Sequence, residues 1–473
     1  MTVPPSTTPA APRRKLAEQV ARRIEDEIVE RGWPVGEPIG AEAELIARYG
    51  VSRAAVREAI SILEYKQVAA MRRGRGGGLV VRAPAGAVVA EAVAAFFHFA
   101  DVSVRELYDA RIILETLAAR LAARRIGEDE ITQLRQVVTA DKVDRPLSVA
   151  IARASGNPVL AIFVPTLTRV TGALAGDPSR EYPLDSEARG ARRKAMHAIA
   201  EAVVSGDEVK SERRVRRQLE GERAWLERTR EKLGTPPVQD GSLAQRLAAV
   251  EGAPGKLPEK VAMLVRQEIR RQGWPTGRVL GNEATLCEEL GVSRAVFREA
   301  VRILEHNGVA RMRQGPGGGL VVQAPDPARV VDALALYLRY LKVRPAELFQ
   351  VRTAVELGSI ELAAARAPHE DTAELEAALA HERDPDVNPV PALADMHVAL
   401  ARMSGNRLLS LFAAVLARLV RFRLPEESMR ARSVAIHEKI AQAVLDGDAS
   451  LARHRLSRHL DALEPWLDES PAR

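Results

Sequence analysis

Two stretches of the chain decide its fold: GVSRAAVREAISILE at residues 50–64 and GVSRAVFREAVRILE at residues 291–305. Each begins with a glycine-containing turn and continues as an apolar pattern with helical period. Ser52 is expected to cap the helix of the first copy. Its buried face is expected to consist of Ala55, Ala59, Ile62 and Leu63. A helix, a short turn and a second helix form the arrangement that places the second helix in a DNA major groove, so each stretch predicts a helix-turn-helix.

The residues around the first copy extend this prediction. An amphipathic helix over residues 15–31 and a short helix over residues 42–48 precede it. Strand-like runs at residues 68–73 and 79–82 flank the glycine-rich residues 74–78, which predicts a β-hairpin wing. A phosphate-binding loop is the alternative for the glycines. It is disfavoured because the Lys-Ser or Lys-Thr pair and the following helix of a Walker loop are missing.

The motif occurs twice because the chain is an internal repeat. Residues 15–84 align without a gap with residues 256–325, at an offset of 241 residues, and 39 of the 70 positions are identical. The similarity continues to the end of each half, which divides the chain into four domains. We expect a disordered tail (1–14), winged domains (15–84 and 256–325), all-α domains (85–232 and 326–473) and a linker (233–255).

Composition agrees with a mainly α protein. Aromatic residues make up only 4% of the 473 residues, so Ala, Leu and Val must build the core, and this favours helices. The single cysteine, Cys287, excludes an internal disulfide and a thiolate zinc cluster. The most apolar early stretch, residues 88–100, is interrupted by Glu91 and is too short to span a membrane. We therefore expect a cytoplasmic protein without a membrane partner.

Charge is concentrated on the predicted DNA-reading elements. The net charge is +6, but residues 52–82 hold seven basic and two acidic residues, whereas residues 15–49 hold five basic and eight acidic ones. A solvated basic face is the alternative interpretation. The duplicated helix-turn-helix favours double-stranded DNA as the partner, since Arg53 and Arg57 could bind guanine or phosphate.

GVSRAAVREAISILE with the following RGRGGGLVV resembles the winged helix-turn-helix of the GntR family, and the alternating domain layout resembles its FadR subgroup. The resemblance implies an all-α, FCD-type domain that binds effectors and dimerises. It also implies DNA contacts from Ser52, Arg53, Arg57, Arg75, Gly76, Gly77, Ser293, Arg294, Arg298, Gly317 and Gly318. The chain departs from the family at Ala43 and Ala284, where an arginine is common, so we expect that contact to be missing in both copies.

Members of the subgroup often hold a divalent metal with an Asp-x-x-x-His pair and two later histidines. In the second copy this pattern matches His397, His437 and His459, in the contexts HVALARMSGN, HEKIAQAV and RHL, which implies zinc or a similar ion there. The first ligand departs from the pattern, because Leu393 stands four residues before His397. Asp395 would point to the opposite side of a regular helix unless a kink near the preceding prolines re-aims it. Polar or partly buried histidines without a metal are the alternative.

The first copy is not expected to hold a metal. Its matching positions are Asp144, Ser148, Met196 and Gln218, so only a carboxylate survives, and this bundle is expected to serve structure and pairing. In the second copy Arg352 could bind an effector carboxylate, or it could pair with Glu356 one helical turn later.

Together these features predict a sequence-specific transcriptional regulator, expected to be a repressor, with no catalytic residues. A small effector, expected to be an organic acid or an acyl compound, would modulate its affinity for DNA. The two halves are expected to pair within the chain, as a monomer or a homodimer, on an operator with two half-sites. Differences at Ala55-Val56 against Val296-Phe297, and at Arg75 against Pro316, suggest that the half-sites differ. The alternatives are a metal-dependent enzyme tethered to DNA and an architectural DNA-binding protein without a ligand.

Overall fold

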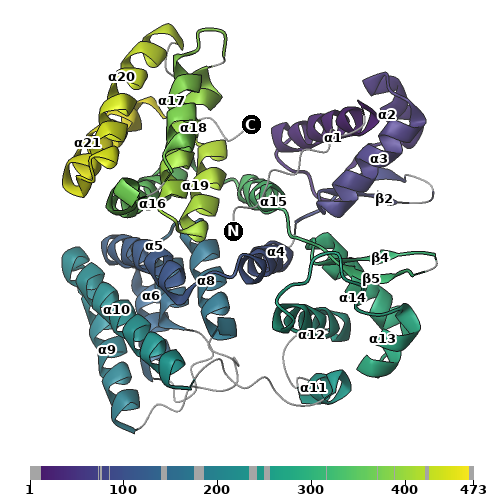
Figure 1. Ribbon diagram of the computed structural model, residues 1–473, viewed down its shortest axis with the longest axis horizontal. Coiled ribbons are helices and arrows are strands. Elements are labelled where there is room, and N and C mark those ends of the chain that lie inside the picture. The colour runs from purple at the N-terminus through teal and green to yellow at the C-terminus, as the bar shows by residue number, and fades with distance from the viewer. Residues whose placement is uncertain are drawn as a thin grey trace. The chain divides into compact units, whose positions relative to one another are not determined.

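The computed structural model describes residues 12–72, 74, 77–84, 86–139, 146–174, 186–233, 242–249, 256–315, 317–369, 371–387, 389–420 and 426–467. It confirms the mainly α class, with helices throughout and only short antiparallel strands (Figure 1). Residues Met1–Val89 and Leu336–Lys342 belong to one compact unit, and Ala90–Ala335 with Val343–Glu469 to another. Among the described residues, none of the helices combines the length and the apolar character needed to cross a bilayer.

The first winged domain is a helix-turn-helix with a three-stranded sheet. Its elements are α1 (Pro12–Glu30), β1 (Pro38–Gly40), α2 (Glu42–Tyr49), α3 (Arg53–Tyr65), β2 (Ala69–Arg72) and β3 (Gly78–Val81). Gly50, at φ 63°, ends α2, and Ser52 Oγ accepts a hydrogen bond of 3.2 Å from the backbone nitrogen of Ala55. The predicted turn, cap and hairpin are confirmed. Strand β1, which pairs with β3, was not predicted, and α1 begins inside the expected tail.

The core of this domain joins α1 to α3 and to the sheet. Val20, Ile24 and Ile28 recur along α1 at period four and are all buried. On α3 the predicted inner residues Ala55, Ala59 and Leu63 are fully buried, while Ile62 is partly buried.

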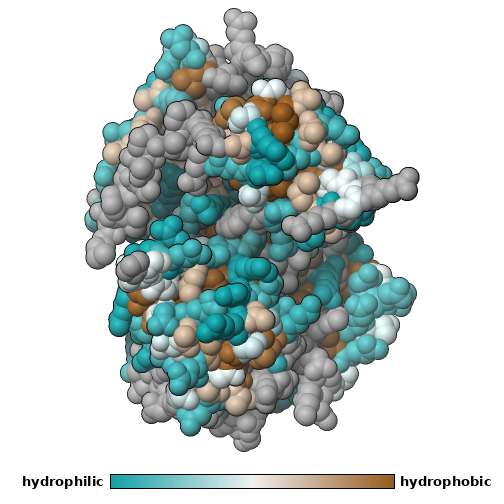
Figure 2. Space-filling view, turned by 90° about the vertical axis from the view of Figure 1, so that its right-hand side faces the viewer, coloured by the Kyte–Doolittle hydropathy of each residue, from teal (hydrophilic) through white to brown (hydrophobic). Residues whose placement is uncertain are grey.

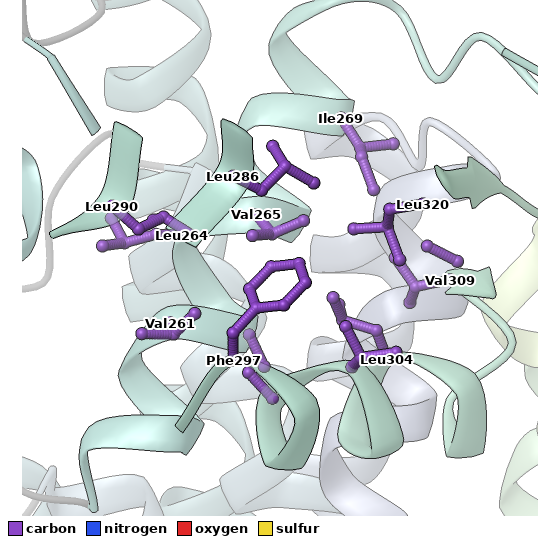
Figure 3. Packing of buried hydrophobic residues seen from close by; sticks show 14 of the residues in the cluster. Val261, Leu264, Val265, Ile269, Leu286, Leu290, Phe297, Leu304, Val309 and Leu320 are labelled. Carbon is purple, nitrogen blue, oxygen red and sulfur yellow. The ribbon is translucent and has the colours of Figure 1, made fainter. Parts of the chain in front are cut away.

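The second winged domain repeats the helices and the hairpin, and an isolated bridge between Val279 and Val321 replaces the third strand. Its elements are α12 (Leu257–Arg271), α13 (Glu283–Leu290), α14 (Arg294–His306), β4 (Ala310–Arg313) and β5 (Gly319–Val322). Figure 3 shows the Phe297 ring in the centre of its core, among side chains of α12, α13 and the sheet. The segment expected to be a linker contains helix α11 (Leu243–Ala249), whose Leu247 joins this core.

A connecting helix follows each winged domain: α4 (Gly86–Phe99) and α15 (Pro327–Tyr340). The two helices dock on opposite winged domains. The Phe99 ring of α4 packs edge-on against Trp274 of the second winged domain, with centroids 5.7 Å apart. The equivalent Tyr340 of α15 packs in the same manner against Trp33 of the first, at 5.3 Å. Each winged domain therefore contacts the helix that leads into the other half of the repeat.

Each half ends in a helical bundle. The first bundle contains α5 (Val104–Arg125), α6 (Glu128–Thr139), α7 (Leu147–Ala154), α8 (Leu160–Leu174), α9 (Ser186–Val204) and α10 (Glu208–Leu233). The second contains α16 (Pro345–Arg366), α17 (Ala373–Arg383), α18 (Pro389–Met403), α19 (Arg407–Leu419), α20 (Glu426–Leu445) and α21 (Ala449–Leu463), with short 3₁₀ turns at Ala367–His369 and Glu464–Trp466.

Equivalent residues of the two bundles make reciprocal contacts. Asn157 Nδ2 donates to the backbone oxygen of Glu347 at 3.0 Å, and Asn406 Nδ2 donates to that of Glu106 at 2.8 Å. Phe163 and its equivalent Phe412 stack with ring centroids 4.2 Å apart. Reciprocity of this kind is what a two-fold interface between identical subunits shows, here within one chain. Both asparagines can be recognised in the sequence as a repeated Ser-Gly-Asn, but the sequence does not show that they join the two bundles.

Candidate functional site

The reading helices, α3 and α14, expose arginines at their N-terminal ends. Arg53 and Arg57 are solvent-exposed, and the Nε atoms of both lie close to Glu42 Oε1, at 2.7 and 2.9 Å. In the second copy Arg298 Nε lies 3.0 Å from Glu283 Oε1. The hydrogen bond from Arg53 lowers the pKa of Glu42. Because exposed ion pairs of this kind contribute little stability, a phosphate or a base edge can replace the glutamate at low cost.

These glutamates were missed by the sequence analysis. Each stands at the first position of the helix before the turn, immediately before Ala43 or Ala284. In both copies the glutamate orients reading-helix arginines from the side. Ser293 caps α14 as Ser52 caps α3, with its Oγ accepting from Val296 N at 3.3 Å, and Arg294 follows it on the exposed face.

Glycine is required in the wings for steric reasons. A Cβ atom on Gly77 would lie 2.3 Å from the backbone oxygen of Arg72, and one on Gly318 would lie 2.3 Å from that of Arg313. Gly317 has φ 70°, a backbone conformation that side chains disfavour. Of the other wing residues expected to contact DNA, Arg75 and Gly76 lie outside the described residues, as does Pro316.

The difference between Val56 and Phe297 does not distinguish the two half-sites, contrary to the prediction. Val56 and its equivalent Phe297 are 0% and 1% exposed, so their difference changes the core and not the DNA-reading face. On the exposed face the copies differ at Ser61 and Arg302, and Arg302 Nη1 donates to Glu299 at 2.9 Å. Figure 2 shows hydrophilic residues interspersed with small hydrophobic patches on the surface that it views.

In the second bundle three helices bring together the predicted histidines. His397 of α18, His437 of α20 and His459 of α21 are 4%, 1% and 5% exposed, and one nitrogen of each lies within 4.8 Å of the others. The Nε2 atoms of His437 and His459 are 3.1 Å apart. We call these three residues the histidine cluster.

Two buried glutamates hold the outer sides of this cluster. His437 Nδ1 lies 2.9 Å from Glu382 Oε1, and His397 Nδ1 lies 2.8 Å from Glu356 Oε2. Metal-binding histidines commonly have such a carboxylate on the ring nitrogen that does not bind the ion. Burial lowers the pKa of His437 to about 4 and that of His459 to about 2, which keeps both rings in the neutral form that a metal needs. Burial also raises the pKa of Glu382 to about 8.

Asp395, expected as a further ligand if a kink re-aimed it, lies apart from the histidine cluster. Its Oδ2 lies 2.9 Å from His381 Nδ1 on the surface, with about half of each side chain exposed. Helix α18 begins at Pro389 and stays regular, so Asp395 keeps the orientation that a residue two positions before His397 has in a helix.

Arg352 forms the pair with Glu356 that its spacing allows. Arg352 Nε donates to Glu356 Oε1 at 2.5 Å, and the side chains of both are 4% exposed. Burial alone would raise the pKa of Glu356, but Arg352 and His397 beside it lower this pKa below its usual range. Glu356 therefore links the arginine expected to bind an effector to a histidine of the cluster.

The first bundle has an ion-pair network at the corresponding place. Arg111 Nε donates to Glu115 at 2.6 Å, and Arg111 Nη1 lies 3.6 Å from Glu222. Gln218, which stands in place of a histidine, donates to the same Glu222 at 3.0 Å. Asp144 lies outside the described residues, and among those described the only group of three candidate ligands is the histidine cluster.

Comparison with known proteins agrees with this architecture. Residues 16–79 and 257–320 match the bacterial regulatory proteins of the gntR family, and residues 106–221 and 347–462 match the FCD domain. The Uxu operon regulator of Haemophilus influenzae is 25% identical over 222 residues, which are 44% of this chain and 81% of that protein.

Two further relatives have similar coverage. An uncharacterized HTH-type transcriptional regulator of Streptomyces ambofaciens is 33% identical over 38% of this chain and 73% of its own length. The HTH-type transcriptional repressor NanR of Cronobacter sakazakii is 26% identical over 36% of this chain and 70% of its own length. These relatives match 36–44% of this chain, which is less than half of it, as expected if one half of the repeat corresponds to one ordinary regulator. The chain belongs to the gntR family of bacterial regulatory proteins, as a transcriptional regulator with two winged helix-turn-helix domains and two FCD domains in tandem.

Proposed function

We propose that one chain binds an operator of two half-sites, with α3 reading one half-site and α14 the other. The observation that carries the proposal is the reciprocal pair of hydrogen bonds between the bundles, from Asn157 to Glu347 and from Asn406 to Glu106. They give one polypeptide the two-fold interface that identical subunits otherwise form. Arg53, Arg57, Arg294 and Arg298 would then supply base or phosphate contacts.

One contact between the bundles favours pairing within the chain over pairing between copies of one bundle. Arg407 forms an ion pair with Glu106, with Nη2 and Oε2 2.7 Å apart. Its repeat equivalent is Pro158, which has no charge to offer Glu347. Two first bundles would therefore lack this contact, and two second bundles would place Arg407 beside Glu347, which already pairs with Arg344 at 2.6 Å.

The histidine cluster is suited to a divalent metal. It offers three buried imidazoles, two of which have a glutamate oxygen 2.8 or 2.9 Å from their Nδ1 atom, and imidazoles are donors that zinc and similar ions accept. The ion would supply an open coordination position for the oxygen of a ligand. We propose that an organic acid binds there, with Arg352 near enough to the cluster to contribute positive charge to carboxylate binding.

The proposed role is repression in the cytoplasm. The protein would repress transcription while it is bound to operator DNA, and the effector would weaken this binding. NanR of Cronobacter sakazakii, one of the relatives, is named as a repressor. Catalysis is not part of the proposal. A tethered metalloenzyme would predict turnover of a substrate that His437→Ala abolishes, and an architectural protein would predict thermal stability indifferent to metals and organic acids.

The proposal is tested by selecting binding sites from random DNA with the full chain. Selected DNA should contain two half-sites and should bind far more tightly than the same sequence scrambled. Equal affinity for the scrambled DNA would contradict a sequence-specific regulator. A promoter–reporter fusion then tests whether the protein represses or activates transcription, since repression predicts higher expression of the reporter when the protein is deleted.

A further inference from the structure

The connecting helices dock on opposite winged domains through equivalent residues. Ala95 and Phe99 of α4 pack on the core of the second winged domain, and Leu336 and Tyr340 of α15, each 241 positions later, pack on that of the first. The apolar and aromatic contacts are nearly the same in both cases. They can hold a connecting helix in place, but they do not distinguish one winged domain from the other.

Charge does distinguish them. Where the first winged domain has the exposed Asp26 on α1, next to a buried Glu25 that lies 2.6 Å from Lys66, the second has Gln267 and the buried Arg266 on α12, and Val29 of the first is replaced by Arg270. The helix α15 meets the acidic surface with Arg339, whose Nη1 lies 3.6 Å from Asp26 Oδ1.

The helix α4 meets the basic surface with His98, the equivalent of Arg339. His98 is 9% exposed, and neither of its ring nitrogens has a hydrogen-bond partner among the described residues. Burial, together with the nearby Arg266 and Arg270, lowers the pKa of His98 well below its usual value, so the ring is neutral at neutral pH. An uncharged ring is compatible with these arginines. If each connecting helix instead docked on the winged domain of its own half, the charged Arg339 would take the place of His98, beside Arg266 and Arg270.

We propose that these charges select crossed docking, in which each connecting helix packs on the winged domain of the opposite half. Arg339 is attracted by Asp26 of the first winged domain and repelled by Arg266 and Arg270 of the second. The partner of each docking surface is thus the connecting helix of the opposite half. Only residues 341–344 separate α15 from α16, which carries Arg352 and Glu356. If the proposed effector site in the second bundle exists, its state would reach the first winged domain through this connection. The docking itself does not depend on that function.

Photo-crosslinking tests which winged domain the helix α15 contacts, without removing a charge. Tyr340 is replaced in the full chain by the aromatic photo-reactive residue p-benzoylphenylalanine, and crosslinked peptides from protein of monomer mass are identified by mass spectrometry. We expect crosslinks to the peptide around Trp33. Crosslinks mainly to the equivalent peptide around Trp274 would show that the docking is not crossed.

Charge reversal then tests whether charge determines which winged domain the helix α15 docks on. In the same background, Arg339→Glu should shift the crosslinks from the first winged domain toward the second, by about fivefold in their ratio. Adding Asp26→Lys to Arg339→Glu should restore the original ratio. Arg105→Glu, a reversal at an exposed position of α5, is the matched control and should leave the ratio unchanged. An unchanged ratio in Arg339→Glu would overturn the proposal that charge selects the docking, even if the crosslinks confirm that it is crossed.

Discussion

Gly358 of α16 lies so close to Ile113 of α5 that a Cβ atom on the glycine would be 2.2 Å from Ile113 Cδ1. The two residues are not repeat equivalents: position 354 matches Ile113 and is alanine, and position 117 matches Gly358 and is leucine. The bundle interface therefore combines a large residue of one half with a gap in the other.

This contact predicts opposite effects of one substitution in two backgrounds. Alanine is favoured over glycine in a helix by about 1 kcal/mol, but overpacking a filled contact costs about 1–3 kcal/mol. Gly358→Ala should therefore lower the thermal midpoint of the wild-type chain and raise it in an Ile113→Ala chain, as measured by calorimetry. Gly221→Ala is the matched control, because Gly221 lies in α10 with open space around it, and it should be stabilising in both backgrounds. The same sign for Gly358→Ala in both backgrounds would contradict the close contact.

The histidine cluster predicts metal-dependent stability. A ligand at 100 times its dissociation constant stabilises the folded state by about 2.7 kcal/mol, so adding zinc to chelator-treated protein should raise the thermal midpoint. His437→Ala should abolish this increase. His454→Ala, which removes an exposed histidine on α21, should retain it. If both variants respond to zinc as the wild type does, the ion binds elsewhere.

The reading helices predict losses restricted to one half-site. Arg57→Ala and Arg298→Ala should each cost about 1–3 kcal/mol of binding free energy if the arginine contacts a base, and each should relax the sequence preference only at its own half-site. Arg22→Ala, at an exposed position of α1, should leave affinity and preference unchanged. Fluorescence anisotropy with single-base variants of the selected DNA measures both quantities. A uniform loss on all sequences would mean that the arginine contacts phosphate only.

Crossed docking predicts where a signal from the second bundle arrives. When zinc is added to chelator-treated full-length protein, hydrogen–deuterium exchange should slow in α18, α20 and α21, which carry the histidines. A second change should appear in α1 and α3 rather than in α12 and α14. A response confined to α12 and α14 would contradict transmission through α15. No change at the histidine helices would instead contradict the metal site.

Much of the fold could be predicted from periodicity and from the repeat. The helix-turn-helix, its serine cap and the hairpin wing follow from local patterns that the structure confirms. The burial of Val56 follows from helical phase, because Ile60 lies about one turn later on the same face and both residues face the core. Strand β1 has only three residues, Pro38–Gly40, which is too short to give an alternating pattern.

Long-range relations could not be predicted in this way. The sequences of α4 and α15 are compatible with docking in either half, because their apolar contacts are equivalent and only the charges around Asp26 and Arg266 differ. Glu382 contacts His437 from a position 55 residues away, on a helix whose pattern gives no sign of a site. The convergence of the three histidines was predicted only through the family resemblance.

In the proposed complex, one chain supplies both reading helices to one operator. Native mass spectrometry of the complex with selected DNA tests it most directly, because it counts the chains bound to each duplex. Reading of both half-sites by one chain predicts one chain on a duplex with two half-sites whose centres are separated by about one helical turn or a multiple of it. It also predicts that deleting either half-site sharply reduces the affinity. Two chains required on each two-half-site duplex, or undiminished binding of one chain to a single half-site, would contradict it.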